Sequence, residues 1–354
     1  MGSIAKKTMR AQQYDARDNT LHLNEIPIPT PRAHELLVKI ACASLCHSDV
    51  MLFEPNDQGL IIGQNPVTIG HEGTGTIVTT GSGAEARKFS KGDEVGFICP
   101  VDCCFECANC RNVHNAWCVT GKVRMQGFTV DGYFQEFAVV DARNAMVLPD
   151  SLDVKTAAPL FCAGVTAYHA IEDCNLEPGQ WVAVIGCGGL GHLGIQYAKA
   201  MGLQVIGLDI APQALEEAKK CGADHVFNSS KDPDWKAKLL EITSGGVDAA
   251  VNFSASKRSY DDCPAILRPG QGLLMVVGIP REPLQLNALD IALGRYRVKG
   301  ANNGTCYNMR PAIEFSAKHT IQPHLTTYKL EEVPKMIELM NSHKAQGRMG
   351  VVFD

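Results

Sequence analysis

Hydrophobic and polar positions follow two different patterns along the chain, and the change comes near Gly164. From Val38 to about Val140, short apolar and β-branched runs such as 67–69 and 75–78 are cut by Gly, Pro and Asn. Runs of this kind predict short strands in a barrel-like or irregular β domain. After Gly164, longer apolar strands alternate with amphipathic helices, which is typical of a parallel sheet with crossover helices. The predicted fold class is therefore α/β, with a β-barrel domain followed by a doubly wound domain.

Most of the helices and strands that the hydrophobic pattern predicts lie in the second half of the chain. Strands are predicted at 181–186, 204–210, 247–253 and 273–279, and helices at 190–201, 214–221 and 259–267. Six such apolar runs would complete a doubly wound sheet. The tail after about Asn302 contains a predicted helix over 330–342 and a strand near Val351. The pattern alone leaves open which domain this tail joins.

Composition and charge are those of a soluble globular protein. The 354 residues, 45% of them hydrophobic and 20% charged, are enough for two domains with separate cores. The net charge of -5 argues against a nucleic-acid partner, because phosphates favour a basic face. The 14 cysteines are clustered or lie singly in apolar segments, no secretory signal opens the chain, and no apolar run reaches membrane-span length. We expect a cytoplasmic protein that acts on a small molecule, with no nucleic acid and no membrane as partner.

Four cysteines lie close together in one polar, irregular segment. Cys104, Cys107, Cys110 and Cys118 follow C-x2-C-x2-C-x7-C spacing. Zn²⁺ takes four sulfur ligands in structural sites, and short loops between the cysteines let the backbone fold around one ion. The alternative is disulfides or free core thiols. A closed four-cysteine site holds structure and does no chemistry, so the active centre is expected elsewhere.

A glycine-rich turn stands between the first predicted strand and helix of the second half. Gly186, Gly188 and Gly191 form G-x-G-x-x-G, with Gly189 and Leu190 between the last two. The first glycine permits a tight turn, the second lets backbone approach a pyrophosphate, and the third lets helix and strand pack closely. The helix N-terminus favours phosphate. The alternative is that these glycines serve packing alone.

Asp209 ends the second predicted strand, where a carboxylate would accept hydrogen bonds from an adenosine ribose. Its charge would repel the 2'-phosphate of NADP, and residues 210–213 offer no Arg or Lys to bind that phosphate. The turn and this acid together predict NAD(H) as the cofactor. A surface or capping role for Asp209 is the alternative.

Two thiols and an imidazole, widely separated along the chain, suggest a second metal site. Cys46, His71 and Cys162 would supply the three protein ligands of a catalytic zinc and leave the fourth position open. Each residue alone has a simpler explanation as a core or satisfied polar residue. Their spacing along the chain does not by itself show that the three residues bind the same metal ion.

At this point the chain resembles the zinc-dependent medium-chain alcohol dehydrogenases. The resemblance runs from about Ala33 to the C-terminus and rests on several motifs in one order. They are Cys46-His47-Ser48-Asp49, Gly70-His71-Glu72-Gly73, the four-cysteine segment, Asp131-Gly132-Tyr133-Phe134, the run from Cys162 to Tyr168, the glycine turn and Gly347-Arg348.

The resemblance implies a GroES-like β-barrel catalytic domain over 1–163 and 303–354 and a Rossmann NAD-binding domain over 164–302, with the site in the cleft between them. It also implies reversible hydride transfer between a primary or secondary alcohol and NAD(H), with one catalytic and one structural zinc per chain. The short segment between Cys118 and Gly132 looks like that of microbial tetrameric members, so a homotetramer is expected, with a homodimer as the alternative.

Roles for individual residues follow from the same resemblance. Ser48 is expected to bind the substrate oxygen and pass on its proton, Asp49 to support His71, and Glu72 to sit behind the zinc and bind it during ligand exchange. His47 and Arg348 are expected to contact the cofactor pyrophosphate. The complete expected cofactor set is His47, Thr166, Gly186, Gly188, Gly189, Leu190, Gly191, Asp209, Val277 and Arg348.

Three residues are expected in the substrate pocket. Met51 stands where many relatives have a His that ends the proton relay, so the relay would exit differently unless the loop is shifted in the alignment. Cys99 replaces an aromatic wall, which would make the pocket roomier, although a buried thiol that only fills space is equally compatible. Phe53 matches another aromatic wall of microbial relatives.

Other members of the same family are the nearest alternatives. A polyol dehydrogenase usually has Glu in place of Cys162, and a zinc-free quinone reductase would lack both ligand sets. A cinnamyl-type aldehyde reductase shares Cys162 but generally carries NADP-selecting residues after the second strand, which are missing here. From a different class, an inactive zinc-binding regulatory protein would not need Ser48, Asp49, Glu72 and Asp209.

Overall fold

The computed structural model describes residues 7–53, 66–342, 345 and 347–354. The chain divides into two compact units. The first comprises 1–162, 304–317 and 323–354, and the second comprises 163–303 and 318–322. Within the described residues, no helix is both long and apolar enough to cross a membrane.

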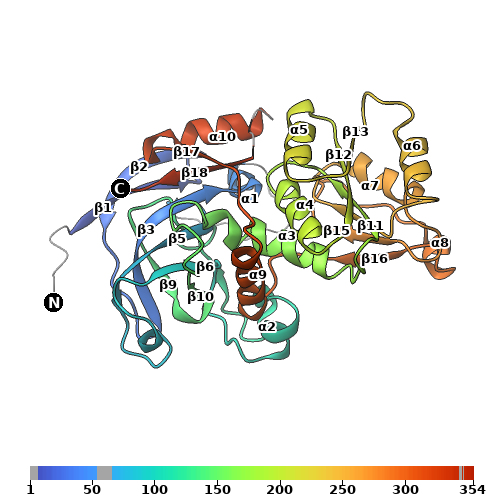
Figure 1. The fold of residues 1–354 in the computed structure, drawn as a ribbon. Helices are drawn as coiled ribbons and strands as arrows, with labels where there is room; N and C mark the ends of the chain where they lie inside the picture. Colours follow the sequence, from blue (N-terminus) through green and yellow to red (C-terminus); the bar gives the residue numbers. More distant parts are fainter. Residues whose placement is uncertain (1–6, 54–65, 343–344, 346) are drawn as a thin grey trace. The chain divides into compact units, whose positions relative to one another are not determined.

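The first unit is built on a mainly antiparallel sheet of seven strands (Figure 1). Its order is β10-β6-β5-β3-β18-β17, and β9 also pairs with β3. These strands are β3 (Glu35–Leu45), β5 (Glu72–Thr80), β6 (Glu94–Phe97), β9 (Phe137–Asp141), β10 (Ala145–Val147), β17 (Leu325–Tyr328) and β18 (Arg348–Val352). Two smaller sheets join β2 (Thr20–Pro27), β1 (Thr8–Asp15) and β4 (Val67–Thr68), and β7 (Pro100–Val101) with β8 (Arg124–Met125). The predicted β domain of short strands is confirmed.

Helices of the first unit are few and mostly short. They are α1 (His47–Val50), α2 (Ala108–Asn112), α9 (Cys306–Lys318) and α10 (Val333–Asn341), with 3-10 turns that include η1 (Met51–Phe53), η5 (Ala158–Phe161) and η7 (Leu330–Glu332). The core of this unit contains the buried rings of Phe97 and Tyr133, whose centroids lie 4.8 Å apart edge to face. Val333 and Met336 from α10 belong to the same apolar cluster. Burial of this face gives α10 its place against the sheet.

Most of the C-terminal tail, residues 304–317 and 323–354, belongs to the first unit. Strand β18 pairs antiparallel with β3, with Met349 opposite Leu45 and Val352 opposite Cys42. This pairing settles the question that the hydrophobic pattern left open, because the last strand completes a sheet that begins near residue 35.

The second unit is a six-stranded parallel sheet with the order β13-β12-β11-β14-β15-β16 (Figure 1). Its strands are β11 (Trp181–Ile185), β12 (Gln204–Asp209), β13 (His225–Asn228), β14 (Ala249–Asn252), β15 (Leu273–Val276) and β16 (Arg297–Gly300). Its helices are α3 (Ala163–Glu172), α4 (Gly191–Ala200), α5 (Pro212–Lys220), α6 (Trp235–Ile242), α7 (Lys257–Asp262) and α8 (Ala288–Ala292). The order reverses between β11 and β14, as in a doubly wound dinucleotide-binding fold. The predicted α/β class is confirmed.

Candidate active site

The end of β3 places the first candidate zinc ligand. Cys46 follows that strand as the N-cap of α1. Its backbone N–H donates to Oδ2 of Asp49 at 2.9 Å, and Oδ1 of Asp49 lies 2.8 Å from Nδ1 of His71. All three residues are buried. One carboxylate therefore fixes two candidate ligands that stand far apart in sequence.

His71 lies directly before β5 and is held by close packing. Gly70 precedes it with φ of +92°, and a Cβ there would lie 2.6 Å from the Phe134 ring. Glycine is therefore the residue that this position accepts. The Phe128 ring lies 5.0 Å from the imidazole, centroid to centroid. Sequence reasoning missed Phe128, since nothing in its spacing links it to His71.

Cys162 enters the site from η5, which ends at Phe161. The Phe161 ring occupies the space above Gly96, where a Cβ would lie only 1.9 Å from the ring. Sγ of Cys162 then lies 3.4 Å from Nε2 of His71. Packing of one ring against a strand glycine thus positions the third ligand.

The donor atoms fit a tetrahedral zinc ion. One ligand atom each from Cys46, His71, Glu72 and Cys162 lies within 4.8 Å of the others. Zinc bonds of about 2.3 Å to sulfur and about 2.0 Å to nitrogen at a tetrahedral angle put those two atoms about 3.5 Å apart. The 3.4 Å between Cys162 and His71 agrees with that separation.

Charge within the cluster favours a metal cation. A hydrogen bond from the Cys162 thiol, together with the His71 imidazole, holds the pKa of Cys46 well below its usual value. The same bond and burial raise the pKa of Cys162. Burial opposes the charged form of His71, but the Asp49 carboxylate and Cys46 outweigh it and raise the pKa of the imidazole. A bound cation would favour the deprotonated form of both thiols, because thiolates are the metal-binding form of cysteine.

Glu72 lies in a buried polar network that the sequence did not reveal. Its Oε2 accepts hydrogen bonds from the Ser44 hydroxyl and from Nη2 of Arg348, while Oε1 is buried and has no partner among the described residues. Burial raises the pKa of Glu72 to about 7, although the Arg348 guanidinium acts in the opposite direction. One carboxylate oxygen of Glu72 belongs to the same group of potential metal ligands as Cys46 and His71.

Arg348 is buried, whereas a residue that contacts a cofactor phosphate at the surface would be exposed. Its side chain is buried and forms an ion pair with Glu72. Its Nε is buried and has no hydrogen-bond partner in the described part of the chain. The predicted contact of Arg348 with a cofactor stays a prediction.

The remaining predicted site residues come from two stretches of the chain, one that forms α1 and η1 and one between β6 and β7 that contains Cys99. His47 is exposed, and Ser48 and Met51 are half-buried. Phe53 packs edge to face on Tyr14 with 4.8 Å between ring centroids, so part of its surface belongs to the barrel core. Cys99 is buried, and burial raises the pKa of its thiol to about 11. A neutral thiol therefore stands near the charges of His71 and Asp49.

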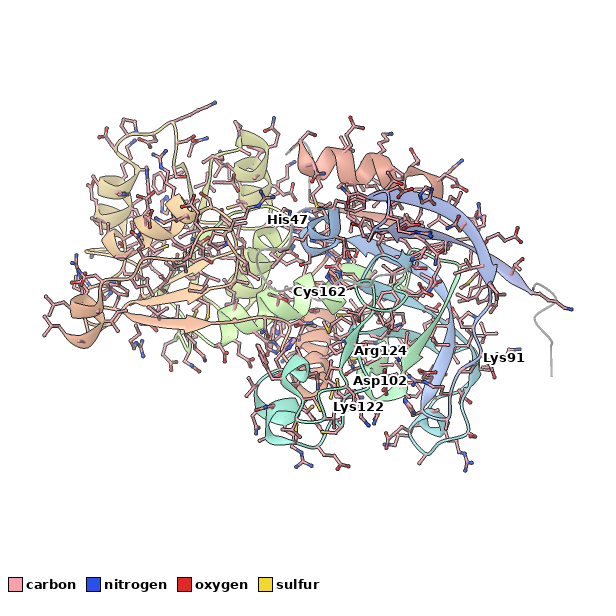
Figure 2. The ribbon with its side chains drawn as sticks, turned by 180° about the vertical axis from the view of Figure 1, so that it is seen from behind. His47, Lys91, Asp102, Lys122, Arg124 and Cys162 are labelled. Atoms are coloured by element: carbon pink, nitrogen blue, oxygen red, sulfur yellow. The ribbon has the colours of Figure 1, made fainter. Side chains whose placement is uncertain are left out.

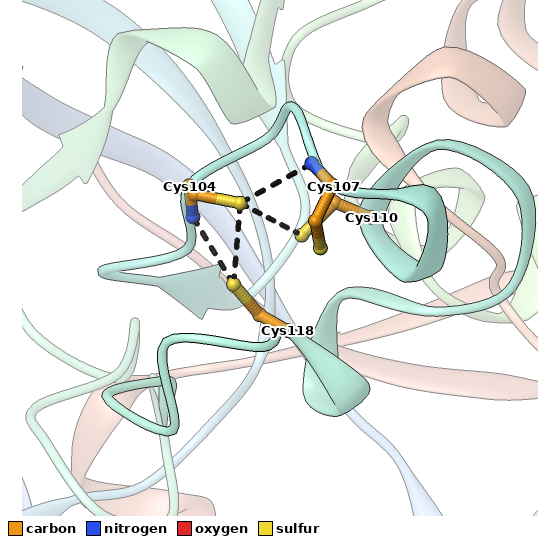
Figure 3. A group of neighbouring side chains, drawn as sticks. All are labelled: Cys104, Cys107, Cys110 and Cys118. Carbon is orange, nitrogen blue, oxygen red and sulfur yellow. Dashed lines mark hydrogen bonds between the residues drawn. The ribbon is translucent and has the colours of Figure 1, made fainter.

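The four-cysteine segment folds into a compact cluster (Figure 3). Sγ of Cys104 lies 3.5 Å from that of Cys118 and 4.0 Å from that of Cys110. Four zinc–sulfur bonds of about 2.3 Å put tetrahedral sulfurs about 3.8 Å apart. Backbone N–H groups of Cys104 and Cys107 donate to Sγ of Cys118 and Cys104, each at 3.3 Å. The cysteines are free, so the disulfide alternative is wrong.

In the second unit, the glycine turn joins β11 to α4, and its three glycines have different surroundings. Gly186 has φ of +82°, and a Cβ on Gly191 would lie 1.9 Å from the Gly186 carbonyl oxygen. Gly188 has no atom within 4 Å of an added Cβ. Leu190 is the N-cap of α4, next to Gly189. The turn thus has two glycines required by its own backbone and one facing open space.

Asp209 lies at the end of β12 beside this turn. Its Oδ2 accepts the backbone N–H of Cys187 at 2.7 Å, and its Oδ1 accepts those of Ile210 and Ala211 at 2.7 and 2.8 Å. The carboxylate is therefore held against the glycine turn. Thr166 is buried in α3, and Val277 follows β15 with its N–H donated to the Asn252 carbonyl at 3.2 Å.

Comparison with known proteins agrees with both units. Residues 32–150 match the alcohol dehydrogenase GroES-like domain, and residues 189–318 match the zinc-binding dehydrogenase domain. An alcohol dehydrogenase of Geobacillus stearothermophilus is 35% identical over 347 residues, covering 96% of this chain and 98% of that protein. The zinc ligand sets and the comparisons therefore point the same way.

Solved structures give the same result. The alcohol dehydrogenase of Aeropyrum pernix superposes with a TM-score of 0.87 at 28% identity, covering 97% of this chain and 100% of that one. A cinnamyl alcohol dehydrogenase of Sorghum bicolor gives 0.84 at 28% identity, with 98% of each chain covered. The chain belongs to the zinc-binding alcohol dehydrogenase family.

Proposed function

We propose that this protein is a zinc-dependent alcohol dehydrogenase that transfers hydride reversibly between a primary or secondary alcohol and NAD(H). The observation that carries the proposal is the convergence of Cys46, His71 and Cys162, with Asp49 orienting the imidazole. This donor set is that of a catalytic zinc with one position left for substrate, and Glu72 stands behind it.

A bound zinc supplies Lewis-acid chemistry by polarising the oxygen of the alcohol or carbonyl. The residues of the chain do the rest. Asp49 keeps Nδ1 of His71 protonated, so that Nε2 faces Cys162 and the metal position. Ser48 would accept a hydrogen bond from the alcohol hydroxyl and relay the proton by donating its own onward, and a bound nicotinamide would supply the hydride acceptor. In the opposite direction Ser48 returns the proton to the nascent alcohol.

We propose that the cofactor is NAD(H), and the residue that supports this choice is Asp209. Its carboxylate is held beside the glycine turn by three backbone N–H groups. In that position the carboxylate can accept hydrogen bonds from the ribose hydroxyls of NAD, and its negative charge repels the 2'-phosphate of NADP. Gly188, which has open space beside it, is the point where backbone can approach the pyrophosphate.

A second candidate within the same reaction type is reduction of bulky aryl aldehydes, as by cinnamyl-type enzymes. Cys99 favours it, because a buried thiol near His71 is smaller than an aromatic wall. The likeness to the sorghum cinnamyl alcohol dehydrogenase is compatible with it. The assignment of Asp209 to NAD(H) favours the first proposal.

The experiment is a matched panel of alcohols and carbonyls, from ethanol to aryl alcohols, each run with NAD(H) and with NADP(H). We expect turnover with NAD(H) and a kcat/KM that rises toward the bulkier substrates. Comparable efficiency with NADP(H) would refute the cofactor assignment, and an ethanol optimum would refute the roomy pocket. Absence of turnover with every substrate and cofactor would refute the enzyme proposal.

The short segment after Cys118 further supports a homotetramer. Light scattering on the purified zinc-loaded protein distinguishes the outcomes. A mass of four chains is expected, and a mass of two chains would favour the dimer.

A further inference from the structure

A cavity of about 440 Å³ in the first unit is lined by none of the residues assigned above to zinc, cofactor or substrate. Its lining consists of four permanent cations, one imidazole, one carboxylate and one thiol. They are Arg32, His34, Asp102, Cys103, Lys122, Arg124 and Arg143. Since the whole chain carries a net charge of -5, four cations around one cavity are a local reversal of charge.

Asp102 lies between two of the arginines. Its Oδ1 accepts from Nη2 of Arg32 at 2.9 Å, and its Oδ2 accepts from Nε of Arg124 at 2.6 Å. These bonds use Nε and Nη2, and within the described residues Nη1 of Arg32 and Arg124 makes no hydrogen bond. Both guanidinium groups therefore keep donors for a further acceptor.

The carboxylates do not compensate all of the positive charge. Glu35 pairs with Arg32 at 2.6 Å, and Asp141 pairs with Arg143 at 2.6 Å. Together with Asp102, that makes three carboxylates for four cations. Lys122 has no ion-pair partner in the part of the chain that the structure describes, so its charge remains uncompensated at the cavity.

His34 contributes the imidazole of the cavity wall. Its Nε2 is buried and has no hydrogen-bond partner among the described residues. The nearest carboxylate oxygen, on Asp141, is 3.8 Å away, which is too long for a hydrogen bond. The other groups of the cavity therefore do not pair with this nitrogen, and His34 adds a further polar side chain to the cavity wall.

We propose that this cavity binds a small phosphate-type oxyanion, either inorganic phosphate or the phosphate group of a small metabolite. Guanidinium forks match phosphate geometry, and Lys adds a point charge. The volume lies within the range of small-ligand sites, which is about 300–1,000 Å³. A polynucleotide is not favoured, because its binding needs an extended basic face and this cation cluster is confined to one concave site.

The position of the cavity gives the anion a structural effect. Asp102 and Cys103 directly precede Cys104, and Lys122 and Arg124 follow Cys118. The cavity is thus bounded by the two stretches that enter and leave the four-cysteine lobe, defined as residues 104–118. These stretches also pair, with Val101 opposite Arg124. A bound anion therefore holds the two ends of the lobe together and slows loss of zinc from it.

The first test is calorimetric titration of the zinc-loaded full chain with inorganic phosphate at constant ionic strength. We expect saturable binding to one site per chain. Lys122→Gln should weaken it at least about tenfold and leave the fold intact, because Lys122 makes no ion pair with any described residue. Lys91→Gln is the matched control with the same charge change; Figure 2 shows Lys91 well apart from Asp102, Lys122 and Arg124. Arg124→Lys keeps the charge and should weaken binding less than Lys122→Gln does.

The titration is repeated with saturating NADH, because the glycine turn is also expected to bind phosphate. Phosphate binding that persists with NADH and is weakened by Lys122→Gln supports the cavity. Binding that NADH abolishes, equal binding in wild type and Lys122→Gln, or no saturable binding would each overturn the proposal.

The second test follows transfer of zinc from the four-cysteine lobe to a coloured chelator. Phosphate should slow this transfer at least about threefold in wild type and in Lys91→Gln, and should leave Lys122→Gln unaffected. Equal slowing in Lys122→Gln, or no slowing in wild type, would contradict the structural effect of the anion.

Discussion

The carboxylate of Asp49 lies 2.8 Å from Nδ1 of His71, and its second oxygen accepts the backbone N–H of Cys46 at 2.9 Å. Asp49→Asn keeps the shape of the side chain but removes the charge that fixes the imidazole tautomer. We expect zinc affinity at this site to fall about 10–100-fold, with a matching fall in kcat/KM. Chelator competition on the zinc-loaded protein measures the affinity. The zinc of the four-cysteine lobe serves as the internal control and should be unaffected; an unchanged catalytic site would refute the orienting role.

Much of the second unit could be predicted from its hydrophobic pattern. The predicted strands at 181–186 and 204–210 correspond to β11 and β12, because both are buried on two faces and read as apolar runs. The edge strands β13 and β16 were not delimited. Their residues are mostly exposed or half-buried, so polar side chains such as Arg297 and Lys299 interrupt the apolar run by which a strand is recognised in sequence.

The site was predicted less completely, and the reason is separation along the chain. The four-cysteine set could be named from its spacing, whereas Cys46, His71 and Cys162 were joined only by the resemblance to the alcohol dehydrogenases. The ion pair of Arg348 with Glu72 could not, because 276 positions separate the two residues and only the pairing of β18 with β3 brings the tail to that region. Phe128 was missed for a similar reason, since a ring beside His71 leaves no periodic signal in sequence.

Packing at Gly96 should control the third zinc ligand. Gly96→Ala would place a Cβ 1.9 Å from the ring of Phe161, which is fully buried and precedes Cys162. We expect a loss of about 1–3 kcal/mol in the free energy of unfolding from overpacking. Displacement of Cys162 should also lower zinc content from two ions per chain toward one.

Gly300→Ala is the matched control, because the nearest atom to its added Cβ is 3.8 Å away. Denaturant unfolding and zinc analysis on both variants check the prediction. If Gly96→Ala kept both zincs and wild-type stability, Phe161 would not be the element that positions Cys162.

The four-cysteine lobe should contribute stability and not substrate choice. Cys107→Ser removes one of four sulfur ligands, so this zinc should be lost while the catalytic one remains. We expect Tm to fall by roughly 5–10 °C, since each 1 kcal/mol shifts Tm by about 2–4 °C in a domain of 150–250 residues. Relative kcat/KM across the alcohol panel should stay the same. A variant that is fully stable and retains two zincs would contradict this role.

Asp209 should decide between the two nicotinamide cofactors. Asp209→Asn removes the negative charge and keeps an oxygen that can accept the backbone N–H groups of Ile210 and Ala211. The ratio of kcat/KM with NAD to that with NADP should fall at least about tenfold, which corresponds to about 1.4 kcal/mol. Steady-state kinetics with both cofactors measures the ratio. An unaltered ratio would show that Asp209 only caps the turn.

The most direct test of the account is to measure zinc content and NAD-dependent alcohol oxidation on the same preparations of the wild type and of Cys46→Ala. We expect two zincs and turnover in the wild type. In the folded Cys46→Ala protein we expect one zinc and a loss of turnover of at least about a thousandfold, because several kcal/mol of charge stabilisation disappear with the metal. Wild-type turnover in a Cys46→Ala protein that holds one zinc would contradict it.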